Sequence, residues 1–282
     1  MILLERPAME PEALRAARDT HLPRLRALVA QQPDGALRPP ERTQYEGYRV
    51  ALAALRAVAG DKCWYCEKRF EGKQEPVEHY RPKQRAHRGE GLPRDGYWWL
   101  AWTWSNLMLV CADCNTAKGT GFPLARGCTP LRPEEQPPGT ERPLLIDPCC
   151  IDPLEHLAFV EAPHDRWIAR AVGGSPLGQT TIEQLGLDGV RRPGVLDLRR
   201  THVSLVVRPR VNGLRELLRR GDAREISEAW RSTCRALLRH AAPYAALSYC
   251  VLRAKISEAE RTRWRLELPR PRKDWGAVLV PP

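Results

Sequence analysis

The sequence contains no run of about 18 apolar residues, the length that a helix needs to cross a bilayer. Its first residues, MILLERPAMEPEAL, lack the charged and then apolar layout of a secretory signal peptide. We therefore expect a cytoplasmic protein with no membrane partner. Because cysteines stay reduced in that compartment, closely spaced pairs among the nine cysteines are interpreted first as metal ligands.

The sequence also lacks an internal repeat and, in its second half, a phosphate-binding Gly-Lys-Ser/Thr loop. A hydrophobic content of 43% and a charged content of 28% are typical of a globular protein. The formal net charge of +11 attracts polyanions, and nucleic acid is the obvious partner. Arginine is abundant throughout the chain, however, and a GC-rich genome would produce the same bias, so charge alone does not decide the function.

Apolar residues at helical spacing predict helices over residues 11–30 and 44–59, and mostly helical structure over 195–268. The stretch between them is irregular, with short strands and turns. We therefore expect an α+β fold made of four parts: an N-terminal helical segment at 1–60, a finger at 61–125, a connector with short strands at 126–190 and a mainly α C-terminal region at 191–282.

Two Cys-x-x-Cys pairs, Cys63 with Cys66 and Cys111 with Cys114, supply four thiolates for a tetrahedral structural Zn²⁺ site. The alternative for these cysteines is burial as small apolar residues. The segment 67–110 between the pairs is longer than an ordinary zinc-ribbon gap, which indicates a functional insertion. Cys128, Cys149 and Cys150 follow without ligand partners at a suitable spacing and stay unassigned.

The insertion contains EHYRPK, beginning at Glu78, and is followed by WSNL around Asn106 and by CNTAKG, beginning at Cys114. Together with the two cysteine pairs, this arrangement resembles the HNH, or ββα-metal, nuclease family. The resemblance implies a β-hairpin followed by a helix that completes a metal site. It covers roughly residues 63–122.

The resemblance makes His79 the general base and Asn106 the residue that holds the hairpin loop, and thereby His79. Glu78 and Asn115 become the ligands of the catalytic metal. Two positions depart from the commonest family pattern: Glu78 stands where Asp is usual, and Asn115 stands where the third motif residue is His. Taken singly, Glu78 and His79 could be surface residues, and Asn115 could cap the next helix.

The same chemistry follows from the residue types. Hydrolysis of a phosphodiester needs a proton acceptor near neutral pH, and histidine, with an unperturbed pKa of about 6.5, suits that role. Oxygen ligands such as those of Glu78 and Asn115 favour Mg²⁺ or Mn²⁺, which would act as a Lewis acid. Arg81, Lys83 and Lys118 flank the site and could bind nucleic-acid phosphates, or they could form a solvated basic face.

Four tryptophans gather before the second cysteine pair, and core packing explains them better than stacking on bases. They are Trp98, Trp99, Trp102 and Trp104.

Further segments, LLIDPCCIDPLEHLAFV and TTIEQLGLD, extend the resemblance to the PtuB-like HNH proteins of bacterial anti-phage Septu and retron systems. In that family the nuclease acts with PtuA, an ABC-type or SMC-like ATPase. The resemblance implies a DNA-cutting effector. The amphipathic helices and many arginines of the second half predict a docking surface for the ATPase, and bare DNA contact is the rival explanation for those arginines. Two alternatives stay open: a stand-alone HNH nuclease for restriction, repair or mobile elements, and a non-catalytic zinc-stabilised adaptor that binds nucleic acid or the ATPase.

Overall fold

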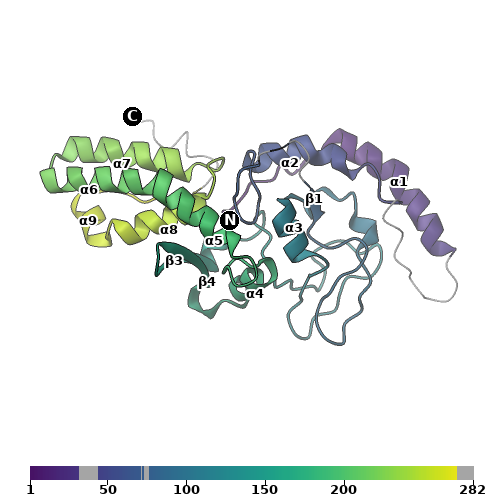
Figure 1. Ribbon diagram of the computed structural model, residues 1–282. Helices are drawn as coiled ribbons and strands as arrows, with labels where there is room; N and C mark the ends of the chain where they lie inside the picture. The colour runs from purple at the N-terminus through teal and green to yellow at the C-terminus, as the bar shows by residue number, and fades with distance from the viewer. Residues whose placement is uncertain (32–43, 71, 73–75, 272–282) are drawn as a thin grey trace.

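The computed structural model describes residues 1–31, 44–70, 72 and 76–271. These residues form an elongated molecule with two groups of elements (Figure 1). One group contains the helices α1 to α3 and the strands β1 and β2, and the other contains β3, β4 and the helices α4 to α9. The expected α+β class is confirmed, since the described residues combine helices with two small antiparallel sheets.

The first group begins with α1 (Glu12–Ala30), which buries Leu14, Leu22 and Leu25 along one face. This helix matches the one predicted over 11–30. The second predicted helix starts later than expected, as the 3₁₀ turn η2 (Tyr48–Ala51) that continues into α2 (Leu52–Ala59). Gly60, with a positive φ of 67°, ends α2 directly before the first cysteine pair.

The finger is built on two short strands, β1 (Val77–His79) and β2 (Leu107–Leu109), which pair antiparallel with His79 opposite Leu107. The intervening chain carries two 3₁₀ turns, η3 (Trp98–Leu100) and η4 (Trp104–Asn106). The helix α3 (Ala112–Lys118) starts at the second cysteine pair. Because side chains alternate across a strand, Val77 and His79 are buried while Glu78 between them is partly exposed.

The second group contains the hairpin of β3 (Leu157–Ala162) and β4 (Arg166–Ala171), preceded and followed by the 3₁₀ turns η5 (Pro153–Glu155) and η6 (Val172–Gly174). Ser175 caps α4 (Pro176–Leu185). The remaining helices are α5 (Gly194–His202), α6 (Arg208–Arg220), α7 (Ala223–Leu238), α8 (Ala245–Lys255) and α9 (Glu258–Arg263).

A wide π-helical turn, η7 (Val203–Val207), joins α5 to α6 without a break. Pro209 follows it in the first turn of α6 and has no backbone N–H to donate. The Nη1 of the next residue, Arg210, donates to the carbonyl oxygen of Val206 at 2.7 Å. The wide turn therefore accommodates the proline within one continuous helical rod.

One hydrophobic core runs through both groups, from Leu14 in α1 to Leu252 in α8. A buried ion pair reinforces the junction: Lys62 donates to Glu67 at 2.9 Å and to the carbonyl oxygen of Ala242 at 2.9 Å. Burial alone would raise the pKa of Glu67, but the charge of Lys62 holds it at about 2. The finger and the C-terminal helices therefore share a continuous interior.

Candidate functional site

Four cysteines come together at the base of the finger. The sulfur atoms of Cys63, Cys66, Cys111 and Cys114 all lie within 4.8 Å of one another, and all four residues are buried. The structure thus brings together the two pairs that lie far apart in the sequence. The connecting chain allows this because Cys111 is the N-cap of α3, which begins shortly after β2 has paired with β1.

The donor chemistry of this cluster fits a structural zinc ion. Four sulfurs at 2.3 Å from a tetrahedral Zn²⁺ would be about 3.8 Å apart, and the Sγ atoms of Cys66 and Cys111 are 3.6 Å apart. Within the described residues, no other group of at least three His, Cys, Asp or Glu side chains has this metal-binding geometry.

His79 projects from the end of β1 into a buried position, with 3% of its surface exposed. Its Nε2 lies 2.9 Å from the carbonyl oxygen of Ala101, which can only accept, so Nε2 carries the proton. Nδ1 is then the unprotonated nitrogen, and the Nζ of Lys83 donates to it at 3.3 Å. Burial lowers the pKa of His79 well below its ordinary value, which keeps the ring neutral with a lone pair on Nδ1.

Asn106 holds the backbone just beyond His79. Its Oδ1 accepts a hydrogen bond from the amide of Arg81 at 2.7 Å, while its Nδ2 donates to the carbonyl oxygens of Arg81 and Leu100 at 3.1 Å each. The side chain is buried, and it joins the chain after β1 to the 3₁₀ turn that contains Leu100. This geometry supports the predicted positioning role of Asn106, because Ala101, the partner of His79, directly follows Leu100.

Replacing Asn106 with alanine is expected to lower the free energy of unfolding by about 2 to 4 kcal/mol, because buried backbone groups of Arg81 and Leu100 would lose their partners. Urea unfolding at a fixed zinc concentration measures the effect. The neighbouring exposed Ser105 provides the matched control, since Ser105→Ala removes a hydroxyl with no buried partner. Equal stabilities of the two variants would contradict the clamp.

Glu78 lies beside His79 and is paired with a lysine from α3. The Nζ of Lys118 is 2.6 Å from Oε1 of Glu78 and 2.8 Å from the carbonyl oxygen of His79. Lys118 is itself buried, so it ties α3 to β1. Asn115, one turn earlier on α3, is partly exposed, and no side-chain hydrogen bond is seen for it within the described residues.

The flanking basic residues have different environments. Arg81 is buried, with its Nε 2.8 Å from Oε2 of Glu141. The ammonium of Lys83 lies over the rings of Tyr45 and Tyr48, 5.5 Å and 4.9 Å from their centroids. Among the predicted phosphate contacts, therefore, Arg81 and Lys118 point into the protein, whereas Lys83 is half-buried next to His79.

Glu141 is a site residue that the sequence analysis missed. Besides Arg81, it accepts hydrogen bonds from the hydroxyl of Tyr97 and from the amide of Leu131 at 3.0 Å. The sequence places it in a polar, proline-rich stretch that gives no sign of burial. The four tryptophans around η3 and η4 are buried, in agreement with core packing. Cys150 lies outside the four-cysteine cluster, with its Sγ 3.6 Å from Oδ2 of Asp147.

Comparisons with known proteins bear on the half of the chain that they cover. The chain is 35% identical to Septu protein PtuB of Bacillus mycoides (strain KBAB4) over 137 residues, which are 47% of this chain and 45% of that protein. It is 39% identical to Septu protein PtuB of Bacillus thuringiensis over 69 residues, 24% of this chain and 23% of that protein. Over about half its length, this chain is PtuB-like. The predicted resemblance to PtuB-like proteins is thereby confirmed over that part of the chain, and the HNH assignment stays a prediction.

A PtuA protein is also similar. The chain is 29% identical to Septu protein PtuA of Bacillus mycoides (strain KBAB4) over 158 residues, which are 55% of this chain and 21% of that protein. The PtuB-like chain thus spans less than half the length of each curated relative that it matches. No family model and no solved structure matches it. Along the part of the chain that the structure describes, no helix is both long and apolar enough to span a membrane.

Proposed function

We propose that this PtuB-like protein is a metal-dependent HNH-type endonuclease that hydrolyses DNA phosphodiester bonds as the effector of an anti-phage defence complex. The observation that carries the proposal is the fixed orientation of His79. Its Nε2 is held by the carbonyl oxygen of Ala101, and Nδ1 is left as the proton-accepting nitrogen, which Lys83 contacts at 3.3 Å. A buried, neutral, oriented imidazole is what a general base requires.

In this mechanism His79 takes a proton at Nδ1 from the water that attacks phosphorus. Lys83 donates to the same nitrogen in the free protein. A substrate phosphate would attract the ammonium of Lys83, since a phosphate anion is a stronger acceptor than a neutral imidazole. Binding of the substrate would then release the lone pair of Nδ1. Asn106 keeps the imidazole of His79 in a fixed orientation, because its hydrogen bonds hold the backbone of Arg81 and Leu100 in place.

A catalytic Mg²⁺ or Mn²⁺ would be held by the oxygens of Glu78 and Asn115. In the free protein the Nζ of Lys118 lies 2.6 Å from Oε1 of Glu78, so a metal ion would bind at this carboxylate alongside the lysine. When bound, the ion would supply Lewis-acid stabilisation of the charge that develops on the phosphate and the leaving oxygen. Lys118 neutralises part of the Glu78 charge and fixes its direction, so Glu78 and Lys118 act together in this proposal.

A PtuA-like ATPase is the proposed partner, docked on the helical second half. We call the second group of elements, from β3 to α9, the second lobe. Several of its exposed arginines, which suggested a binding face, are already paired with acidic residues of the same lobe: Arg219 with Glu216, Arg220 with Glu225 and Arg224 with Glu228. A face neutralised in this way fits a protein better than a DNA backbone, which demands unopposed positive charge. Similarity to both PtuB and PtuA proteins supports a place in one system.

The stand-alone nuclease and the non-catalytic adaptor are separated from this proposal by one assay. Supercoiled plasmid is incubated with the full-length protein in Mg²⁺, in Mn²⁺ and in EDTA, with and without the co-encoded PtuA-like ATPase, and an RNA substrate is run in parallel. We expect nicking with either metal and none with EDTA, and a stimulated rate with the ATPase. Zinc content is measured after each incubation, so that loss of the catalytic ion is distinguished from loss of the structural one. Cutting that ignores the ATPase would favour the stand-alone enzyme, and no cutting in any arm would leave the adaptor.

A further inference from the structure

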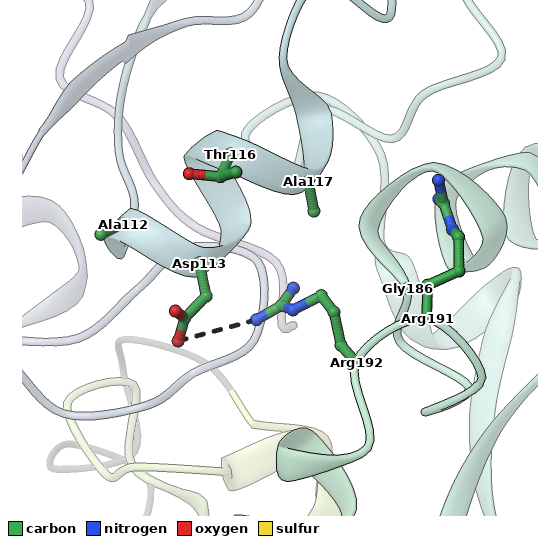
Figure 2. Close-up of a pocket in the computed structure, with 7 residues that line it drawn as sticks. All are labelled: Ala112, Asp113, Thr116, Ala117, Gly186, Arg191 and Arg192. Atoms are coloured by element: carbon green, nitrogen blue, oxygen red, sulfur yellow. Dashed lines mark ion pairs between the residues drawn. The ribbon is translucent and has the colours of Figure 1, made fainter.

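A guanidinium group from the second lobe reaches the four-cysteine cluster. Nη1 of Arg192, in the loop between α4 and α5, lies 3.4 Å from Sγ of Cys114 and 2.7 Å from the carbonyl oxygen of Leu185. Its Nη2 is 4.0 Å from Oδ2 of Asp113 on α3, the ion pair drawn in Figure 2. The neighbouring Arg191 points in another direction in the same view. Arg192 thus connects the loop to the helix that carries Cys114.

The loop and α4 are shaped around this connection. Gly186 has a φ of +60°, and a Cβ there would lie 3.0 Å from Cδ of Arg192, so its lack of a side chain makes room for the arginine stem. Just before it, Nε2 of Gln184 donates to the carbonyl oxygens of Ala117 and Lys118 at 3.3 Å and 3.0 Å. These two residues form the end of α3, so both ends of the finger helix are held by the same segment of the second lobe.

Charge gives a second, independent reason for the contact. Four thiolates around one Zn²⁺ carry a net charge of about −2, which is costly to bury without positive partners. The guanidinium of Arg192 supplies such a positive partner in direct contact with a sulfur of the cluster.

We infer that Arg192 is a counter-charge of the zinc tetrathiolate and donates directly to Cys114, so that zinc retention and the docking of the second lobe on the finger stabilise each other. A hydrogen bond to a coordinating sulfur reduces the charge on it and slows its protonation and release. The inference rests on the zinc site and is independent of nuclease activity.

The test compares Arg192→Met with Arg191→Met in the full-length zinc protein. Arg191 lies in the same loop and is exposed, so it controls for loss of a charge there. We expect Arg192→Met to transfer zinc to a chromophoric chelator about ten times faster than the wild type, and Arg191→Met to match the wild type. In zinc-loaded Arg192→Met, hydrogen exchange over residues 186–193 should also increase.

The Co²⁺-substituted proteins supply a readout that general destabilisation would not change. Loss of the N–H···S bond should shift the sulfur-to-cobalt charge-transfer band of Arg192→Met, while the ligand-field bands still report four-sulfur tetrahedral coordination. Arg192→Lys, which keeps the charge, should release zinc at an intermediate rate. If the methionine variant fails to fold, the lysine variant is used for the same measurements. Identical zinc release and identical charge-transfer bands in the Arg192 and Arg191 variants would overturn the inference. Such a result would not affect the nuclease proposal, which the plasmid assay decides separately.

Discussion

Alanine in place of His79 is expected to reduce DNA cutting at least about a hundredfold, while about one zinc ion per chain is retained. In the proposed mechanism the imidazole supplies the proton acceptor at Nδ1, and it does not belong to the four-cysteine cluster. Plasmid nicking under single-turnover conditions measures the loss. Zinc content and circular dichroism show whether the fold has survived.

The burial of His79 calls for a second variant. Its ring packs edge-on against Tyr48, with the centroids 4.7 Å apart, so alanine leaves a cavity as well as removing a base. Glutamine approximates the size of the ring and can donate to the carbonyl oxygen of Ala101, but its amide is not a useful base. His79→Gln should therefore be as inactive as His79→Ala and more stable. A folded variant of either kind that cuts at the wild-type rate would remove His79 from the mechanism.

Serine in place of Cys63 or Cys114 is expected to release the zinc and unfold at least the finger. Structural zinc contributes an apparent binding free energy of about 10 to 16 kcal/mol in small zinc domains, which is comparable to the whole stability of a typical domain. The cluster also closes the chain around the entire insertion, because Cys63 precedes β1 and Cys114 lies on α3. Metal analysis and thermal unfolding measure the two effects.

Cys150→Ser is the matched control for the cysteine variants, because Cys150 is exposed and lies outside the four-cysteine cluster. It should keep its zinc and its melting temperature. Soluble, active wild-type protein that contains no zinc after careful purification would contradict the site. A stable, zinc-loaded Cys114→Ser variant would also contradict the four-cysteine site, since three sulfurs would then be enough to hold the zinc and the fold.

The cysteine cluster could be predicted from sequence because each ligand pair is local and only the approach of one pair to the other depends on the fold. The roles proposed for His79 and Asn106 depended on a resemblance that preserves the order of short motifs. The environments of the basic residues could not be predicted in this way. Arg81 is buried against Glu141, which lies 60 residues later in the chain, and no sequence pattern around either residue predicts this ion pair.

The second lobe was predicted only coarsely. Helical periodicity indicated α structure over 195–268, and the structure contains α6 to α9 there. Periodicity reports which face of a helix is buried, but it does not show that an arginine such as Arg199 belongs to that face. Only the assembled structure shows that the carbonyl oxygens of Leu187 and Trp167 accept hydrogen bonds from Arg199. For the same reason, the contact of Arg192 with Cys114 carried no signal in the sequence.

The wide turn Val203–Val207 sets the rotational phase of everything that follows it. Each residue of an α-helix rotates the chain by about 100°, so the loss of a single residue in this segment would turn α6 by that angle relative to α5. Val211 and Leu214 would leave the core, and arginines of α6 would face it. The number of residues in this segment is therefore constrained more tightly than their identity. Another apolar residue can replace one of its valines, whereas a one-residue deletion, which a surface loop would tolerate, would misalign all the helices that follow.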